Sequence, residues 1–159
     1  MRSRSTLGTV AVLTGALAAA GLAFAPTAGA VSPGTATAQY DCGSWGGGTA
    51  NITATQSGTS ATMTISTAVT TPIAVGTDQI NATLTLAKAG GGTRVFTGKK
   101  NPAVGAGQPV TIGPLSGTVA SGDSLNSYFA GVALKMVIFG VTVNCDAVTS
   151  QSPGPFVFS

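Results

Sequence analysis

Ala61-Thr62-Met63-Thr64-Ile65-Ser66 is the stretch of this sequence that decides its fold class. Apolar and polar side chains alternate along it with a period of two, which is typical of a β-strand that buries one face. Residues 50–55 show the same alternation, and the turn-forming sequence Gln56-Ser57-Gly58-Thr59 separates the two runs. We therefore expect residues 50–66 to form a β-hairpin.

Further alternating runs follow along the chain. Residues 79–87 place Ile80, Ala82, Leu84 and Leu86 on one face, and residues 93–97 form a shorter run after a glycine-rich turn. Two bends rich in Pro and Gly enclose 110–112, so strands there are expected to be short or to lie at edges. No window has the periodicity of a helix.

The stretch from Tyr128 to Cys145 is apolar at both odd and even positions and should hold the most buried strands. Counting back in twos from Cys145 places Val143, Val141 and Phe139 on the inward face, provided that no bulge intervenes. The sequence leaves open whether Phe139-Gly140 is a turn between two strands or a bulge within one.

About seven to nine short strands with regular turns predict a single antiparallel β-sandwich of the immunoglobulin-like type, over residues 37–149. The hallmarks of true immunoglobulin domains are absent, since Trp45 lies three residues after Cys42 and not in the middle of the domain. Residues 150–159 are expected to be a linker with an apolar tail, which either docks as a final strand or pairs with another chain.

The first thirty residues have the order of a signal peptide. Arg2 and Arg4 precede an apolar segment from Leu7 to Phe24, and Ala28-Gly29-Ala30 provides a cleavage site, although an earlier site at Ala25 is also possible. We expect residues 1–30 to be removed and residues 31–36 to form a flexible leader. No second apolar run of spanning length follows, so the mature protein is expected to be secreted or associated with the cell surface.

Two cysteines in an exported chain predict a disulfide between Cys42 and Cys145. It would close a loop of about 104 residues, for which the chain-entropy treatment gives about 4.7 kcal/mol of stabilisation. The sequence contains no histidine and no third cysteine. It therefore predicts neither a metal site nor a cofactor.

The order of several short segments carries a resemblance. These segments are Tyr40-Asp41-Cys42, the punctuated stretches 71–76 and 102–107, and Val141-Thr142-Val143-Asn144-Cys145. With the signal peptide, they make the chain similar to small secreted actinobacterial proteins of uncharacterised function. The resemblance implies a single immunoglobulin-like domain and provides no catalytic residues to carry over.

Charge excludes one class of partner. Without Arg2 and Arg4, the seven basic residues become five against four acidic ones, which leaves a net charge of +1. Nucleic acid binding normally requires a dense basic face, so no nucleic acid partner is predicted.

Asp41 and Asp146 each adjoin a cysteine, so the disulfide would bring two carboxylates together. Such a pair can hydrolyse glycosides or hold calcium, but inward cysteines would point both neighbours into solvent. A small hydrolase using these aspartates is the least favoured function.

Trp45 and the basic residues suggest another alternative. Lys88, Arg94, Lys99 and Lys100 are expected to cluster around the Gly90–Gly92 turn. Trp45, Lys99 and Lys100 are the candidate ligand contacts of a module that binds carbohydrate or a cell-wall polymer. The favoured function remains a secreted, non-enzymatic interaction domain whose partner, a protein or a wall polymer, the sequence does not identify.

Overall fold

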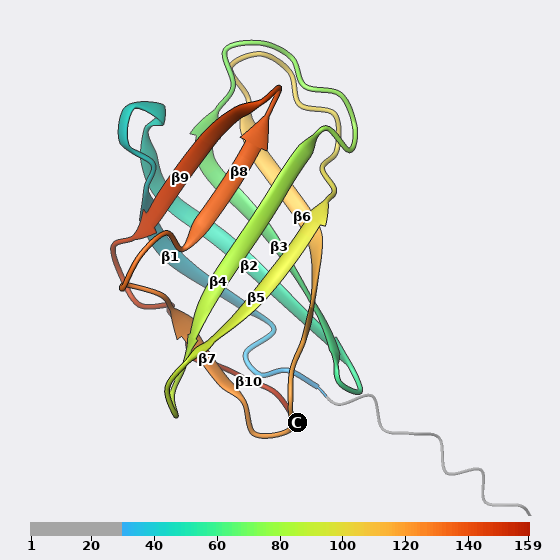
Figure 1. Cartoon of the computed structure of the whole chain (residues 1–159), viewed down its shortest axis with the longest axis vertical. Helices are drawn as coiled ribbons and strands as arrows, with labels where there is room; N and C mark the ends of the chain where they lie inside the picture. The colour runs from blue at the N-terminus through green and yellow to red at the C-terminus, as the bar shows by residue number, and fades with distance from the viewer. Residues whose placement is uncertain (1–29) are drawn as a thin grey trace, which may run out of the picture.

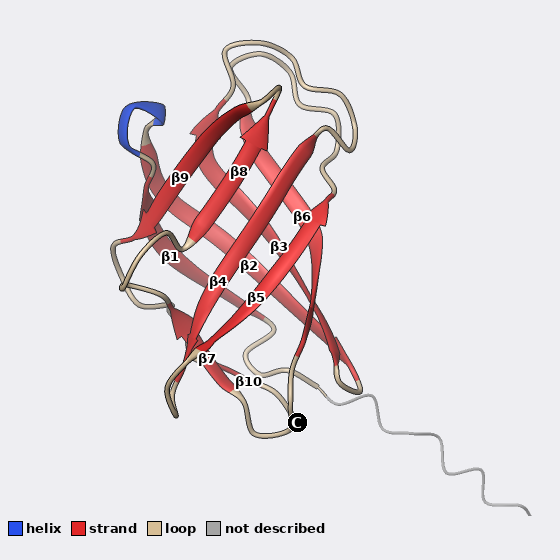
Figure 2. Cartoon of the chain, viewed as in Figure 1, coloured by secondary structure: helices blue, strands red, loops and turns tan. Residues whose placement is uncertain are grey.

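The computed structural model describes residues 30–159, and these are almost entirely β-structure (Figures 1 and 2). The expected signal peptide lies outside the described residues, apart from Ala30. Ten strands and one short 3₁₀ helix follow in this order: β1 (Thr35–Asp41), η1 (Gly43–Trp45), β2 (Gly47–Ser57), β3 (Ser60–Thr70), β4 (Ile80–Lys88), β5 (Thr93–Lys99), β6 (Pro109–Thr118), β7 (Ser124–Ser127), β8 (Leu134–Ile138), β9 (Val141–Ala147) and β10 (Phe156–Val157).

Eight of these strands close into an antiparallel barrel, in the order β4-β5-β6-β3-β2-β1-β9-β8 and back to β4. The strands β7 and β10 lie outside the ring. β8 pairs with the first half of β4, and β7 pairs with the last residues of β4. β10 pairs with the other side of β7 (Figure 1).

The predicted immunoglobulin-like sandwich is therefore wrong, and two thin seams explain why. β1 meets β9 through two residue pairs, Tyr40 with Ala147 and Asp41 with Asp146, and β5 meets β6 through one pair, Thr97 with Ser116. These few pairs join the edges of two larger sheets and close the ring. Strand periodicity reports which face is buried, but it does not report whether distant edges pair.

Glycine allows close packing at the β5–β6 seam. The ring of Phe96 lies over Gly117, and a Cβ added at Gly117 would stand 2.5 Å from Phe96 Cδ1. Phe96 is completely buried. A side chain at this position would separate the two strands at the point where the barrel turns.

The disulfide between Cys42 and Cys145 is confirmed, and it lies beside the other seam. Cys42 directly follows β1, and Cys145 is in β9, one residue before the pair formed by Asp41 and Asp146. The two Cα atoms are 4.0 Å apart, and both cysteines are buried. The covalent bond therefore reinforces a junction that has few backbone hydrogen bonds of its own.

The strand faces follow the predicted periodicity closely. β2 and β3 form the expected hairpin, with Ser57 opposite Ser60 across a turn at Gly58 and Thr59. The inward positions of β3, and those of β4 from Ile80 to Leu86, are all buried. The largest completely buried side chains form one core inside the barrel and beneath β7 and β10: Phe96, Phe156, Phe158, Ile52, Met63, Ile65, Ile80, Leu84, Leu86, Ile112, Leu115 and Leu125.

β6 is longer than the sequence suggests. It continues from Pro109 to Thr118 through Gly113 and Pro114, because these two residues form a bulge where the register with β3 shifts between Met63 and Ile65. Gly113 has a φ of 115°, and a Cβ there would meet the carbonyl oxygen of Met63 at 2.6 Å. The bulge absorbs the proline without ending the strand.

The chain ends are part of the fold. Thr35 and Ala36, which the composition placed in a leader, belong to β1. The apolar tail docks as β10, with Phe156 and Phe158 buried. The hydroxyl of Ser159 donates to the carbonyl of Ala30, so both ends of the described chain lie together, at the lower end of the barrel in Figure 1.

Candidate functional site

An apolar pocket of about 180 Å³ opens at the opposite end of the barrel. In Figure 1 the β8–β9 turn, the loop after β3 and the short helix η1 lie toward this upper end. They provide most of the pocket walls, with Trp45 from η1, Val69 and Ile73 from the end of β3 and its loop, and Phe139 and Val141 from the β8–β9 hairpin. Among the described residues that line it, two threonines are polar and none is charged.

Exposed apolar side chains surround the mouth of this pocket. Trp45 is 39% exposed, Ile73 57%, Phe139 58% and Val141 46%. A concentration of large apolar groups around one concave surface is typical of a binding site, whereas isolated exposed apolar residues are ordinary. We call these four residues the apolar rim.

The prediction that Phe139 and Val141 point inward is wrong, because Phe139-Gly140 is a two-residue turn that reverses the chain. Ile138 pairs with Val141 across it, and Phe139 and Gly140 have φ angles of 49° and 80°. Val143 and Cys145 are buried, as predicted. The alternation therefore holds in β9 but excludes its first residue, which lies at the barrel mouth.

Phe139 occupies its position at an energetic disadvantage. A two-residue turn with positive φ at both positions favours Asn, Asp or Gly at the first. A bulky residue in the left-handed region costs on the order of 1–3 kcal/mol. The Phe139 ring is also mostly exposed to solvent. Neither the turn conformation nor burial therefore favours a phenylalanine at this position.

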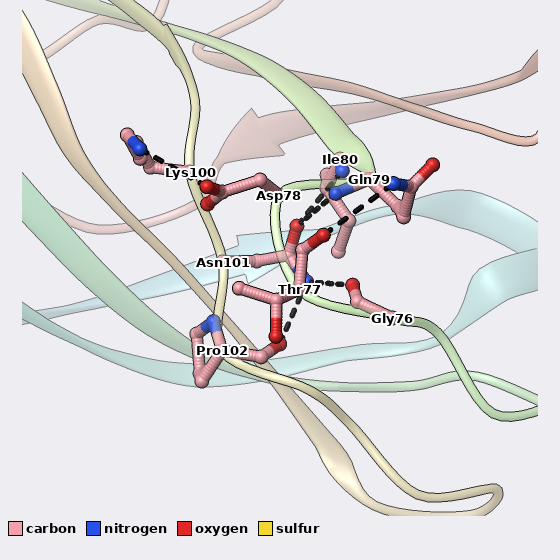
Figure 3. Close-up of polar contacts among 8 residues, drawn as sticks. All are labelled: Gly76, Thr77, Asp78, Gln79, Ile80, Lys100, Asn101 and Pro102. Atoms are coloured by element: carbon pink, nitrogen blue, oxygen red, sulfur yellow. Dashed lines mark hydrogen bonds and ion pairs between the residues drawn. The ribbon is translucent and has the colours of Figure 1, made fainter.

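Two loops form a fixed cap beside the pocket, and Asn101 connects them (Figure 3). The Asn101 side-chain oxygen accepts hydrogen bonds from the backbone N–H groups of Gln79 and Ile80, at 2.8 and 2.9 Å. Its side-chain nitrogen donates to the carbonyls of Gly76 and Pro102, at 2.8 and 2.7 Å. Asn101 is 3% exposed, so these bonds are shielded from water.

Other contacts hold the same loops. Val75 and Val104 exchange two backbone hydrogen bonds of 2.8 Å. Lys100 pairs with Asp78 at 3.0 Å, and its hydrogen bond lowers the pKa of that exposed carboxyl. These contacts hold in place the loop that provides Ile73 and Val75 to the pocket.

Thr71 is the one buried polar residue of the pocket lining. It is 5% exposed, its carbonyl accepts a 2.7 Å hydrogen bond from the Gly107 N–H, and its hydroxyl has no partner within residues 30–159. Buried hydroxyls nearly always have a hydrogen-bond partner. The neighbouring Thr70 also lines the pocket but is exposed to solvent.

The structure separates the predicted ligand contacts. Trp45 lines the apolar pocket, whereas Lys99 and Lys100 do not. Lys100 pairs with Asp78, as described above. Lys99 lines a different, shallow groove of about 400 Å³ on the outer face of β4, β5 and β8, together with Lys135.

The expected basic cluster is also divided. Lys88 and Arg94 lie at the far end of the β4–β5 hairpin, where both bind Asp123, at 3.1 and 2.7 Å. Burial raises the pKa of the Asp123 carboxyl, but the hydrogen bonds from Arg94, the Ala120 N–H and Lys88 outweigh it and lower that pKa to about 2. These two cations hold the loop before β7 through Asp123.

Asp41 and Asp146 are brought together, as the disulfide predicted, because they face each other across the β1–β9 seam. Both are exposed, and Asp41 accepts a 2.9 Å hydrogen bond from the Gly43 N–H. In the part of the chain that the structure describes, no three residues among His, Cys, Asp and Glu gather as metal ligands. The pair lies on an open surface, outside the apolar pocket.

Sequence reasoning missed most of the apolar rim. Ile73 follows Pro72 in a bend, and an apolar residue exposed in a Pro/Gly-rich loop was a usable signal. The pair Phe139-Gly140 inside an apolar run was a second signal, because a glycine there allowed a turn that would expose Phe139.

Comparison with known protein families, curated proteins and solved structures finds no match to this chain. Within residues 30–159, no helix has the length and apolar character needed to cross a membrane.

Proposed function

We propose that this protein is an exported, non-enzymatic binding domain that holds an apolar ligand group in the pocket at the upper end of the barrel. The observation that carries the proposal is Phe139, an exposed aromatic ring at a strained turn position beside an apolar pocket. Strain that persists in a structure is characteristic of functional positions. The disulfide supports an oxidising compartment and thus the export that the first thirty residues predict.

The pocket has the features of a small-molecule site. It is concave, its lining is mostly apolar, and the Asn101 cap fixes one wall in advance. A preformed pocket loses little conformational entropy on binding, so even a small ligand can gain affinity from burial.

The experiment is a titration with toluene followed by the fluorescence of Trp45. This residue is the only tryptophan in the sequence and lies on the apolar rim, so its emission reports directly on the pocket. We expect a saturable change in emission for the wild-type protein. A linear or absent response would contradict the proposal.

Two matched variants locate the binding site. Val141 and Val95 are both strand residues that are 46% exposed, but only Val141 lines the pocket. We expect Val141→Asp to weaken toluene binding at least about tenfold, because the carboxylate lies against the apolar ligand. Val95→Asp should bind as the wild type does. Equal binding by the two variants would place the site elsewhere.

Binding to a cell-wall polymer is the second candidate, supported by the shallow groove that Lys99 and Lys135 line. A polyanionic wall polymer would contact both ammonium groups. We expect the double variant Lys99→Gln, Lys135→Gln to lose retention on purified teichoic acid, and Lys100→Gln, outside the groove, to keep it. Retention of the double variant would exclude the groove.

A further inference from the structure

We infer that the groove between Lys99 and Lys135 binds a polyol phosphate, whose phosphate lies between the two ammonium groups and whose hydroxyl groups contact Asn81 and Thr83. This inference rests on the second candidate function, since it names the chemical group that the same groove accepts. Three properties of the groove support it, which are its two unpaired cations, their positions on either side of β4 and the neutral polar side chains between them.

Lys99 and Lys135 are the two basic side chains that form no ion pair within residues 30–159. The other three hold Asp123 or Asp78, and Lys99 acts on the Asp78 carboxyl only at longer range than Lys100 does. Both unpaired lysines line the same groove, and no acidic residue of the described chain lines it with them. Two like charges in one concave site, without a counter-charge, attract an anion.

The position of Lys135 excludes a common structural role for a lysine in a sheet. Lysines on an exposed edge strand prevent two sheets from pairing. β8, which contains Lys135, pairs with β4 on one side and with β9 on the other. Lys135 itself lies opposite Thr83 in β4 and Asn144 in β9. Protection of an edge therefore does not account for this lysine.

The two lysines stand diagonally across β4, which lies between β5 and β8 (Figure 1). Lys99 is opposite Asn81, and Lys135 is opposite Thr83, which is two residues further along the same face of β4. With strands about 4.8 Å apart and a rise of about 3.4 Å per residue, the two lysine Cα atoms lie about 12 Å apart. Lysine side chains have flexible four-carbon stems, so both ammonium groups can reach one anion above Asn81 and Thr83.

The residue types of the groove favour a phosphate over a carboxylate. Arginine binds planar carboxylates through two parallel hydrogen bonds, whereas the lysine ammonium acts as a point charge and suits the tetrahedral oxygens of a phosphate. The described lining residues include lysines and no arginine. A phosphate monoester carries a charge of about −1.5 to −2 at pH 7, which two ammonium groups balance.

The neutral side chains between the lysines determine what the phosphate is attached to. Asn81 and Thr97 are exposed and Thr83 is half-buried, and all three line the groove. Their amide and hydroxyl groups both donate and accept hydrogen bonds, as the hydroxyl groups of a polyol do. The groove volume of about 400 Å³ exceeds what a bare phosphate needs and lies in the range of small-molecule sites. The ligand therefore carries a short hydroxylated chain.

Glycerol phosphate and propyl phosphate test this inference, because they share a phosphate and a three-carbon chain and differ by two hydroxyl groups. Each is titrated into the isotope-labelled protein, and the amide signals of β4, β5 and β8 are followed by NMR. We expect saturable shifts, with glycerol phosphate bound at least about fivefold more tightly, which corresponds to one net hydrogen bond. Glycerate has the same two hydroxyl groups and a carboxylate in place of the phosphate, and it should bind at least about fivefold more weakly than glycerol phosphate.

Substitutions locate the two parts of the site. Lys99→Gln and Lys135→Gln should each weaken the binding of both phosphates about tenfold, because each removes one charged donor. Thr83→Val exchanges a hydroxyl for a methyl group, so it should weaken glycerol phosphate binding about fivefold and leave propyl phosphate binding unchanged. Thr85→Val is the matched control, because Thr85 is half-buried on the same face of β4 but lies outside the groove. Thermal unfolding of each variant verifies that the barrel is intact.

Glycerophosphoglycerol, the diester unit of a glycerol teichoic acid, distinguishes two sources of the bound group. If it binds at least as tightly as glycerol phosphate, the wall polymer is the source. Weaker binding identifies a free polyol phosphate as the source. Both results support the inference.

The remaining outcomes separate the inference from the second candidate function. The inference is overturned if the two phosphates bind equally, if glycerate binds as tightly as glycerol phosphate, or if Thr83→Val weakens both phosphates alike. Retention of teichoic acid without saturable binding of glycerol phosphate also overturns it, and leaves the groove as a site for polymer charge alone. If the wild-type protein neither retains teichoic acid nor binds glycerol phosphate, the inference and the second candidate function are both wrong.

Discussion

Replacing Asn101 with alanine should remove the main connection between the two loops beside the pocket. The side chain makes four hydrogen bonds to backbone groups, two as acceptor and two as donor, with distances of 2.7 to 2.9 Å. At about 1 kcal/mol for each buried bond, the free energy of unfolding should fall by about 4 kcal/mol. Such a large loss is rare for a single substitution, because few side chains leave so many groups unpartnered.

Urea unfolding followed by Trp45 fluorescence measures this loss. The midpoint should decrease while the slope with denaturant stays constant, because the same surface is exposed on unfolding. Asn51→Ala, at an exposed position of β2, provides the control and should change stability by less than about 0.5 kcal/mol. A loss below about 1 kcal/mol for Asn101→Ala would refute the reasoning and assign the loop contact to other bonds, such as those between Val75 and Val104.

Three further predictions concern other parts of the barrel. Phe139→Asn should raise the free energy of unfolding, measured in urea, by about 1 kcal/mol, because asparagine tolerates positive φ. The same variant should bind toluene more weakly. A destabilised variant with full toluene binding would contradict the role assigned to the Phe139 ring. The pKa of the Asp123 carboxyl is lowered to about 2. Its ionised form therefore contributes on the order of 2 kcal/mol of stability above about pH 4, and this contribution is lost as the pH falls toward 2. Asp123→Asn should remove this part of the pH dependence of thermal unfolding, and an unchanged pH profile would contradict the prediction. Gly117→Ala should lower the free energy of unfolding by about 1–3 kcal/mol, because the added Cβ would meet the Phe96 ring at 2.5 Å. Gly90→Ala is the neutral control, since nothing lies within 4 Å of a Cβ added there. Equal melting temperatures for the two variants would contradict the prediction and show that the β5–β6 seam adapts.

Local patterns in the sequence predicted the parts of the fold that depend on one strand or one turn. The alternation in β3 and β4 identified their buried faces, because a pleated strand that buries one side must alternate. The pairing of Cys42 with Cys145 followed from the expectation of export and from the absence of any other cysteine. These properties need no knowledge of the rest of the chain.

Closure of the barrel could not be predicted in the same way. It depends on three residue pairs at two seams. One seam joins segments at the two ends of the domain, as in the pair of Asp41 with Asp146. The other joins consecutive strands through the single pair of Thr97 with Ser116. The position of Gly117 under Phe96 offered no signal until the neighbouring strand was known.

The candidate site was predictable only in part, for a related reason. Trp45, which lines the apolar pocket, was predicted as a candidate ligand contact from its residue type and its position beside a glycine run. Lys99 and Lys100 were grouped with it by composition, but the barrel directs the first to an outer groove and the second to Asp78. A pocket formed by separate loops has no contiguous sequence pattern.

The positions of Ala30 and Ser159, the two ends of the described residues, bear on how this protein can be presented. Ala30 and Ser159 meet at the end of the barrel away from the pocket. Material joined at Ala30 or at Ser159, such as a bead, a fused enzyme or a layer of molecules on a sensor, would therefore be separated from the pocket mouth by the length of the barrel. An immobilised array of such barrels would present every mouth to the surrounding fluid, so the attachment chemistry could be chosen freely.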